Sequence, residues 1–493
     1  MDPETGQPVK IQMNPDGPSP LCVDLDGTLL LSNSWAESFC LLLKSEPWML
    51  LRLPVWLLRG RANLKSEIAL RVNPGVRSWP LNVEVLGFLQ AAKSSGRTIV
   101  LVTTADRRVA AAMQSRLNLF DDIISGDGAV NLTSESKAAA LQQRFGSKNF
   151  DYLGNHPADL PVWEAARSAG LVGPEDGARA RLAGRIKKST PLEWVFTTPR
   201  ISVKDCVQAL RVHQWSKNLL LLVPVISAHQ WTDPAHIWPV ILGVAAFSLC
   251  ASSVYLLNDL LDLEADRHHL SKRHRPFASG KIPLLAGLGT APVLLVLSAA
   301  MACCLGWKFM AFFAAYYLTT LLYSLRLKQV ALLDVLTLAG LYCLRILAGG
   351  IAADVPVSDW LMMFSLFVFL SLAFVKRFTE IRVFQNADDG KLKGRGYESS
   401  DAELVGTMGI ASGYLSVLVL AMYITHPSVT SLYGNPQVLW LTCPLLLYWI
   451  SRVWLLAHRQ AMHEDPILFA LRDRQSWIVL ILMAAIGFAA GPR

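Results

Sequence analysis

Long apolar runs separated by short polar loops fill the chain from Leu219 to its end, whereas residues 1–200 carry mixed, charge-rich sequence. One of these runs, residues 237–257, is long enough to cross a bilayer as a helix. The 493-residue chain is 52% hydrophobic, and its mean hydropathy of +0.35 is too high for an ordinary soluble protein. The sequence therefore predicts a multidomain protein, in which a soluble domain precedes an all-α membrane bundle.

The membrane part is predicted to contain nine transmembrane helices. Their centres fall near residues 222, 247, 294, 316, 341, 367, 416, 446 and 483. The loops on one side, at 258–283, 326–328, 376–403 and 452–474, carry 17 Lys and Arg residues, whereas the alternate loops, at 229–236, 306–308, 353–359 and 426–435, carry only Lys308. Positively charged loops stay in the cytoplasm, so the first set is expected on the cytoplasmic side of a bacterial-type inner membrane. The net charge of +8 is then a topology signal, and no nucleic acid is expected as a partner.

The soluble domain shows polar motifs at the ends of predicted strands. Residues 21–23 form an apolar strand that runs into Asp24-Leu25-Asp26-Gly27-Thr28, and residues 98–102 form another that runs into Thr103. A third, at 151–153, is followed by Gly154, Asn155 and Asp159, and Lys137 opens a helical stretch. Because strands alternate with helical segments, the sheet is expected to be parallel and doubly wound. Such sheets bind ligands at the carboxyl ends of their strands. Residues 1–20 lack the apolar core of a signal peptide, so this domain is expected in the cytoplasm.

These motifs resemble the haloacid dehalogenase-like hydrolase superfamily over residues 15–185. The resemblance implies a Rossmann-like α/β domain with a helical cap, in which Asp24 is the nucleophile that forms an aspartyl-phosphate and Asp26 is the general acid/base. It also implies that Thr103 and Lys137 bind the phosphoryl group and that Mg²⁺ is held by Asp24, Asp26 and Asp159. The family usually has an acid where this chain has Asn155. A degenerate, regulatory domain therefore remains an alternative.

The predicted cap, residues 39–77, contains an unusually apolar segment at 48–61. It is apolar nearly all round, with Arg52, Arg59 and Arg61 interspersed. The segment is too short to span a bilayer. Two interpretations stay open: the segment lies at the membrane interface, or it is the core of the cap.

Residues 258–280 combine acids and bases in one stretch. Asp259, Asp262 and Asp266 follow each other at i, i+3 and i+7, which places three carboxylates on one face of a helix, with Asn258 at its edge. Carboxylates together with substrate phosphates are the usual ligands of Mg²⁺. A basic run follows at once: Arg267, His268, His269, Lys272, Arg273, His274 and Arg275. A solvated, positive loop explains the bases but not the acids, so this stretch predicts a site for a metal and a diphosphate. The three histidines are interpreted as solvated.

Further candidates lie at the predicted cytoplasmic ends of the spans. Arg345 lies within a span, where an arginine costs about 2.5–3.5 kcal/mol on insertion scales, so it should face a polar cavity or an acid. For Lys376 and Arg377, snorkelling at a helix end is the alternative to substrate binding. The residues predicted to bind substrate here are Lys217, Asn258, Tyr323, Lys328, Arg345, Lys376, Arg377 and Glu380.

The sequence NDLLDLEADR at 258–267 resembles the first aspartate motif of the UbiA superfamily of intramembrane prenyltransferases, a resemblance that covers about residues 200–493. Together with HQWSKN (213–218), KRHRPFASG (272–280), LAFVKRFTE (372–380) and GRGY (394–397), it is most similar to the decaprenyl-phosphate phosphoribosyltransferases. That branch implies Mg²⁺-dependent transfer of phosphoribose from phosphoribosyl diphosphate to a polyprenyl phosphate such as decaprenyl phosphate. The loop at 376–403 contains Asp388 and Asp389 but mostly Lys and Arg, which suits a phosphate-rich donor.

The expected organisation is a phosphatase domain at 15–185, a linker and amphipathic helix at 186–212, and a transferase domain at 213–493. Asp259 and Asp262 are the expected catalytic acids of the transferase, with Asp266 as a further metal ligand, and the first domain is expected to dephosphorylate the product. Two other functions stay open: a prenyltransferase with a polyprenyl diphosphate donor and a small aromatic or other acceptor, and a lipid-binding module with a hydrolase-like sensor. The lipid bilayer is an expected partner on this interpretation, and assembly into a homo-oligomer stays open.

Overall fold

The computed structural model describes residues 18–72, 75–126, 134–269, 271–385, 396–426, 433–462 and 465–491. The chain divides into two compact units. The first comprises Met1–Leu210 and Tyr255–Thr290, and the second comprises Arg211–Val254 and Ala291–Arg493. The acidic stretch therefore belongs to the same unit as the soluble domain.

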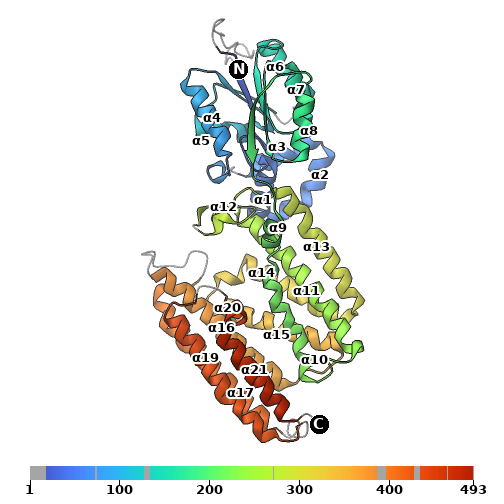
Figure 1. Ribbon diagram of the computed structural model, residues 1–493, viewed down its shortest axis with the longest axis vertical. Helices are drawn as coiled ribbons and strands as arrows, with labels where there is room; N and C mark the ends of the chain where they lie inside the picture. Colours follow the sequence, from blue (N-terminus) through green and yellow to red (C-terminus); the bar gives the residue numbers. More distant parts are fainter. Residues whose placement is uncertain are drawn as a thin grey trace. The chain divides into compact units, whose positions relative to one another are not determined.

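A parallel sheet forms the centre of the first unit (Figure 1). It has six strands in the order β3-β2-β1-β4-β5-β6. Its strands are β1 (Leu21–Asp24), β2 (Ile99–Asp106), β3 (Asp122–Gly126), β4 (Asp151–Gly154), β5 (Ala169–Pro174) and β6 (Leu192–Thr198). The two inner strands that flank β1 are β2 and β4, so their polar carboxyl ends lie next to Asp24. This order confirms the predicted parallel sheet.

Helices cover both faces of the sheet, because successive side chains of a strand point to opposite sides. Leu21 and Val23 of β1 pack in one core with α4 (Val83–Ser94) and α5 (Arg107–Leu117). Cys22 packs on the other face with α6 (Ser134–Phe145), α7 (Leu160–Ala165) and α8 (Gly177–Ile186). The sheet is therefore doubly wound, as predicted.

The segment expected to be a linker after residue 185 contains the last strand of the sheet. In β6 the side chains alternate between half-buried and exposed, as on an edge strand that covers one end of the sheet. The short helix α9 (Val203–Ala209) follows, with Ser202 as its N-cap. The linker prediction was thus wrong for residues 192–198, because an edge strand is polar enough to resemble a linker.

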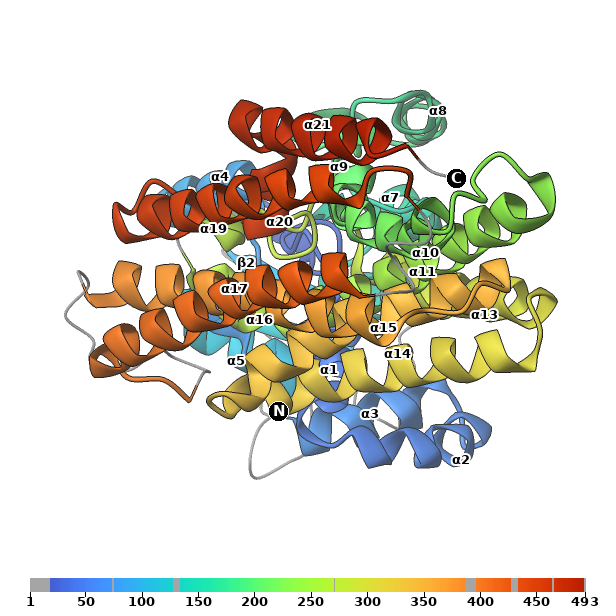
Figure 2. The same ribbon diagram turned by 90° about the horizontal axis from the view of Figure 1, so that it is seen from below.

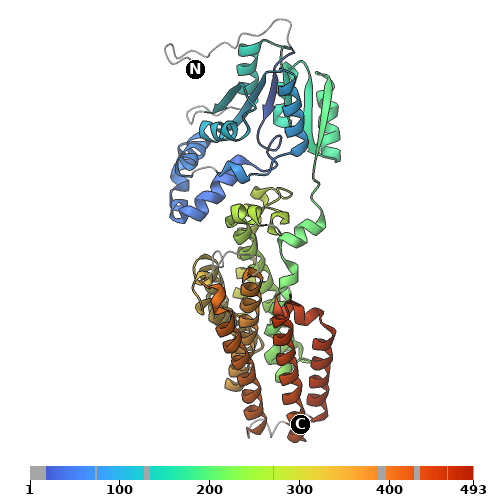
Figure 3. The ribbon, with the colours of Figure 1, turned by 90° about the vertical axis from the view of Figure 1, so that its left-hand side faces the viewer.

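The predicted cap is an all-helical insertion between β1 and α4. It consists of α1 (Ser34–Ser45), a 3₁₀ turn (Pro47–Arg52), α2 (Leu53–Leu58) and α3 (Arg61–Arg71), drawn in blue in Figure 3. Leu42, Trp56 and Ile68 hold these helices together in a small core of their own. The acidic stretch completes the unit with the end of α11 (Pro234–Leu261), α12 (Leu263–His268) and the start of α13 (Leu284–Cys304).

The second unit is a bundle of helices. It contains most of α11 and α13, then α14 (Trp307–Leu325), α15 (Leu333–Ala353), α16 (Asp359–Gln385), α17 (Ala402–Thr425), α19 (Thr442–His458), α20 (Pro466–Arg472) and α21 (Arg474–Ala489). Helix α16 packs beside both α15 and α17 (Figure 2), and these three share a core with α19. Many outward side chains are apolar, such as Leu318 and Leu322 of α14, as expected for a lipid-facing surface.

Within the described residues, six helices are long and apolar enough to cross a membrane: α11, α13, α15, α16, the α17 region and the α19 region. The predicted count of nine is therefore not confirmed. The chain near residue 222 forms a 3₁₀ helix (Val212–Leu222) and the five-residue α10 (Val223–Ser227), with Pro224 at the junction. Helix α21 has 16 residues and is shorter than a full span. Helix α14 is long enough to cross a membrane but less apolar than these six, because it contains several tyrosines and Lys308.

Candidate functional site

Asp24, the last residue of β1, forms a buried ion pair with Lys137 of α6. The Lys137 ammonium lies 2.6 Å from Asp24 Oδ1. Burial raises the pKa of the Asp24 carboxyl to about 7, and Lys137 offsets part of that rise. Burial alone would lower the pKa of Lys137, but the Asp24 and Asp159 carboxylates raise it above its ordinary value. Thr103 is buried on the neighbouring strand, one residue beyond the partner of Asp24 in the sheet.

Asp26 is held by the first residue of the cap. It accepts hydrogen bonds from the Ser34 backbone N–H at 2.7 Å and from the Ser34 hydroxyl at 2.9 Å. Burial raises the pKa of Asp26, although the two hydrogen bonds from Ser34 oppose that rise. A carboxyl with a raised pKa beside a carboxylate is suited to exchange protons in a reaction.

Asp159 supports the turn that carries Asn155. Its carboxylate accepts from the backbone N–H groups of Asn155 and His156, at 3.4 and 3.3 Å, and from the Tyr152 hydroxyl at 3.3 Å. The Asn155 side-chain oxygen Oδ1 in turn accepts from the Thr28 hydroxyl at 3.3 Å. Gly27 has a φ of +76°, and a Cβ atom there would lie 2.1 Å from the Asn155 amide nitrogen. Asn155 thus packs directly on the loop between the two aspartates.

The oxygen donors of this site fit a hard cation such as Mg²⁺, and buried carboxylates with raised pKa values are groups that a cation would stabilise. Within the described ranges, however, no three His, Cys, Asp or Glu side chains converge closely enough to hold a metal ion. This applies to the acids of the sheet and equally to those of residues 259–266. To bind a metal, either place would need oxygen ligands from the substrate or small movements of the side chains.

The spacing of the acids predicted one continuous helix, but the acidic stretch is divided between two helices. Helix α11 ends at Leu261, and α12 begins at Leu263 with Asp262 as its N-cap. The main chain bends there but keeps its bonding, because the Asp262 N–H donates to the Asn258 carbonyl at 2.9 Å. Asn258 and Asp262 are half-buried, whereas Asp259 and Asp266 are buried.

Asp259 and Asp266 share one cationic partner. A terminal nitrogen of Arg275 lies 3.2 Å from Asp259 Oδ1 and 2.7 Å from Asp266 Oδ2. A guanidinium therefore sits where two carboxylates converge, a place that suits a metal ion bound to a diphosphate. His268, His269 and His274 are exposed, as predicted.

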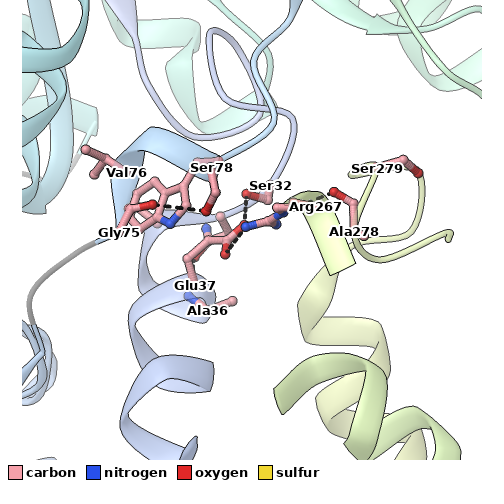
Figure 4. A network of polar contacts seen from close by, with 12 residues as sticks. Ser32, Ala36, Glu37, Gly75, Val76, Ser78, Arg267, Ala278 and Ser279 are labelled. Atoms are coloured by element: carbon pink, nitrogen blue, oxygen red, sulfur yellow. Dashed lines mark hydrogen bonds and ion pairs between the residues drawn. The ribbon is translucent and has the colours of Figure 1, made fainter. Parts of the chain in front are cut away.

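Arg267, next to Asp266, connects the acidic stretch to the cap (Figure 4). Its two terminal nitrogens donate to the Glu37 carboxylate of α1, at 3.0 and 2.6 Å, and its Nε donates to the Ala278 carbonyl at 3.0 Å. The Ser32 hydroxyl donates to the same carboxylate at 2.5 Å. Gly280 packs against the same region, because a Cβ atom there would lie 3.0 Å from both Leu31 and Pro80. The residues just after Asp26 therefore contact and bind the residues just after Asp266.

In the second unit, Asp465 brings together two of the predicted lysines. Its Oδ2 atom lies 2.8 Å from the Lys217 ammonium and 3.4 Å from that of Lys376 in α16. Burial alone would raise the pKa of Asp465, but the two lysines hold it well below its ordinary range. Asp465 was not predicted from the sequence, because the 452–474 loop is conspicuous only for its positive charge. An aspartate directly before Pro466 is a helix N-cap signature that could have drawn attention to it.

Arg345 is buried in a network of neutral groups. Its guanidinium donates to the Asn218 side-chain carbonyl at 2.9 Å, to the Leu341 backbone carbonyl at 2.7 Å and to the Tyr316 hydroxyl at 2.9 Å. The Tyr342 ring lies 5.4 Å from the guanidinium carbon. Arg345 thus occupies a polar environment, as its position in a span predicted.

Arg377 is fully buried and therefore does not snorkel. It lies 2.6 Å from Asp334 Oδ2 and also pairs with Glu380, and the Tyr397 hydroxyl donates to Asp334 at 2.6 Å. Tyr323 at the end of α14 and Lys328 in the following 3₁₀ turn (Leu327–Gln329) are half-buried. Asp388, Asp389 and Arg395 lie outside the described residues.

Comparison with known proteins locates this chain among membrane transferases. Residues 220–478 match the model of the UbiA prenyltransferase family. The uncharacterized protein y4nM of Sinorhizobium fredii is 38% identical over 94% of this chain and 90% of its own length. The nodulation protein NoeC of Azorhizobium caulinodans is 36% identical over 60% of this chain and 94% of its own. The decaprenyl-phosphate phosphoribosyltransferase of Mycolicibacterium smegmatis is 35% identical over 38% of this chain and 59% of its own.

The match to the family model covers more than half of the chain, and the similarity to y4nM covers nearly all of it. The chain belongs to the UbiA prenyltransferase family.

Proposed function

We propose that this protein transfers 5-phosphoribose from phosphoribosyl diphosphate to a polyprenyl phosphate, such as decaprenyl phosphate, at the cytoplasmic face of an inner membrane. The observation that carries the proposal is the meeting of Asp259 and Asp266 at Arg275, which combines acids for a metal with a base for phosphate in one segment. The similarity to the decaprenyl-phosphate phosphoribosyltransferase of Mycolicibacterium smegmatis supports the choice of donor. The positive loops on one side support the orientation.

The transfer requires little covalent help from the protein. The bond between the anomeric carbon and the diphosphate breaks, and a phosphate oxygen of the lipid forms the new bond to that carbon. This oxygen is already anionic near neutral pH, so positioning and charge stabilisation supply most of the catalysis. Mg²⁺, held by Asp259, Asp262 and Asp266, would neutralise the departing diphosphate.

The remaining polar residues would bind the two phosphate-bearing substrates. Lys217 and Lys376 are fixed by Asp465 and present their remaining N–H groups as donors. Arg275 would exchange its two carboxylates for diphosphate oxygens. Asn258, Tyr323, Lys328, Arg345, Arg377 and Glu380 complete the proposed binding residues, with Arg345 and Arg377 also fixing the helices that carry them.

The sheet domain would then remove the 5-phosphate from the product. In this proposal Asp24 attacks phosphorus, and the ester oxygen of the ribose leaves with a proton from Asp26. Asp26 then takes a proton from the water that cleaves the aspartyl-phosphate. Lys137 and Thr103 bind the phosphoryl oxygens, and Mg²⁺ held by Asp24, the Asp26 carbonyl and Asp159 would offset their charge. The ion pair of Asp24 with Lys137 and the two hydrogen bonds on Asp26 support these roles.

The alternative transferase uses a polyprenyl diphosphate donor and a small acceptor, which the family name favours. Two parallel incubations distinguish the proposed transferase from this alternative. Membranes containing the protein are incubated with isotope-labelled phosphoribosyl diphosphate and decaprenyl phosphate, or with a labelled prenyl diphosphate and aromatic acceptors. Label in the lipid fraction from the first donor, lost in Asp262→Asn, supports the proposal. Turnover of the prenyl diphosphate alone overturns it, and turnover of neither donor leaves a lipid-binding role.

A further inference from the structure

The cap of the sheet domain carries an apolar surface on its outer side. Between Trp48 and Leu58, six large apolar side chains are exposed, which we call the cap patch: Trp48, Leu50, Leu51, Val55, Leu57 and Leu58. Leu51 is 84% exposed and Leu58 is 89% exposed. Isolated apolar residues on a surface are ordinary, but a contiguous group of this size marks a contact with another apolar body.

Packing within the cap does not account for this surface. Met49, Leu53 and Trp56 face inward and join the small core with Leu42 and Ile68. These inward residues recur at i, i+4 and i+7, as one face of a helix does. Leu51, Val55 and Leu58 recur at the same spacing on the opposite face. The segment is therefore apolar on two faces, and only one of them is used inside the described protein.

The exposed charges around the cap patch are positive. Lys44, Arg52 and Arg59 are exposed beside it, and the sequence has no acid between Glu46 and Glu67. A short apolar helical segment with basic residues and a tryptophan near its start is typical of chain that lies in the interfacial layer of a membrane. The charge pattern is complementary to anionic lipid headgroups.

We propose that the cap patch docks on the surface of a bilayer that contains anionic lipids. The chain belongs to a family of membrane proteins and contains six described helices of spanning length, so this domain is covalently attached to a part that is expected to span a bilayer. A second copy of the chain is a poorer partner, because a symmetric contact through the patch would bring its arginines against their own copies. A segment of this length also lies along a membrane rather than across it.

The patch is connected to the proposed hydrolase site through α3. The Lys65 ammonium donates to the Thr104 carbonyl and hydroxyl, at 3.3 and 3.4 Å, beside Thr103. A hollow lined by Ser34, Trp35, Lys65 and Asp106 lies between the cap and the sheet. On the proposed function, docking would keep this hollow near the membrane surface, where a lipid-linked phosphate ester lies. The membrane contact itself rests only on the patch and its charges.

The contact is tested with the full chain in nanodiscs that contain anionic lipid. Leu58→Cys carries an environment-sensitive fluorophore in a background in which the exposed Cys206, Cys303 and Cys304 are replaced by serine. Val83→Cys is the matched control, because Val83 of α4 is 79% exposed in the same unit. Nitroxide-bearing lipids are expected to quench the label at 58 several-fold more than at 83, and aqueous iodide is expected to do the reverse. Strong iodide quenching at both sites overturns the proposal. So does a label at 58 that neither quencher reaches, or a disulfide that joins two copies of the Leu58→Cys variant through the introduced thiol.

A functional experiment separates the patch from the proposed hydrolase. The double variant Leu51→Glu with Leu58→Glu changes two exposed side chains and should fold. Hydrolysis of a lipid-linked phosphoribose in vesicles is expected to fall by about tenfold or more, whereas hydrolysis of a water-soluble phosphate ester stays unchanged. An equal rate on the lipid substrate overturns the role of the patch. If the unaltered chain hydrolyses neither substrate, the proposed hydrolase fails, and the quenching experiment alone decides the membrane contact.

Discussion

Arg267 and Glu37, 230 positions apart in the sequence, form a two-pronged ion pair with N–O distances of 3.0 and 2.6 Å. Their side chains are 7% and 2% exposed. The pair lies one residue from Asp266 at one end and three residues from Ser34, the partner of Asp26, at the other. The supports of the two proposed catalytic centres therefore meet at one buried contact.

Removing one partner of this pair should be more harmful than removing both. Glu37→Ala leaves a buried arginine without its counter-charge, and such a change costs about 3–5 kcal/mol. The double variant with Arg267→Ala removes that penalty, so a double-mutant cycle should give a coupling of about 2 kcal/mol. Calorimetry of the full chain measures the cycle.

The matched control for this cycle is Lys93 with Asp121, a close pair on the same domain whose side chains are 35% and 37% exposed. Its coupling should stay below about 1 kcal/mol, because water screens exposed charges. Additive effects of Glu37 and Arg267 would show that the buried pair contributes no more than a surface contact.

Asn155→Asp should lower the Mg²⁺ concentration that the proposed hydrolase requires. The new carboxylate keeps the acceptor for the Thr28 hydroxyl and adds a negative charge on the turn that Asp159 holds. We expect half-maximal hydrolysis at roughly tenfold less Mg²⁺. The titration is run beside Asn149→Asp, the same substitution at an exposed position, which should behave as the unaltered chain. An unchanged Mg²⁺ requirement in Asn155→Asp would remove this turn from the metal site.

Arg275→Gln should alter metal and donor binding in opposite directions. Without the guanidinium, Asp259 and Asp266 lose the cation that neutralises them, so Mg²⁺ alone should bind roughly tenfold more tightly. The KM for phosphoribosyl diphosphate should rise, because a phosphate ligand is lost. Arg273→Gln, an exposed neighbour, should change neither constant. If Arg275→Gln weakens Mg²⁺ binding, the guanidinium does not compete for the metal position.

Asp465→Asn should destabilise the helical unit at neutral pH and less so in acid. Lys217 and Lys376 would lose their shared counter-charge, at a cost of roughly 2 kcal/mol, reduced from a fully buried pair because Lys376 is partly exposed. A lowered pKa in the folded state stabilises the protein above the unfolded-state pKa of about 4, and this stabilisation is lost as the pH falls below it. Thermal unfolding at pH 7 and at acid pH compares this variant with the exposed Glu403→Gln. A difference that persists unchanged into acid would contradict the assigned charge.

Local sequence patterns predicted much of the fold. The strand before Asp24 and the strand before Thr103 were visible from hydrophobic pattern, because each depends on neighbouring residues. The helical cap followed only from the resemblance of the motifs to a known superfamily. The long spans were visible from length and hydropathy. The edge strand β6 was missed, since its exposed face makes it as polar as a linker.

Contacts between distant residues were not accessible from the sequence. Arg267 was seen only as part of a basic loop, although it neutralises Glu37 on the cap, and Asp465 was not considered although it joins Lys217 to Lys376. Both pairings depend on how helices fold back on each other. The bend at Asp262 was also missed, because the spacing of the acids is the same in a straight and in a bent helix.

The central claim is that one chain makes a lipid-linked phosphoribose and then dephosphorylates it. Mass spectrometry of lipids from vesicles supplied with phosphoribosyl diphosphate, decaprenyl phosphate and Mg²⁺ tests it most directly. The unaltered chain should yield a lipid-linked ribose, Asp24→Asn should accumulate its phosphorylated precursor, and Asp262→Asn should yield neither. A lipid pool that stays free of ribose and of phosphoribose with the unaltered chain would contradict the account.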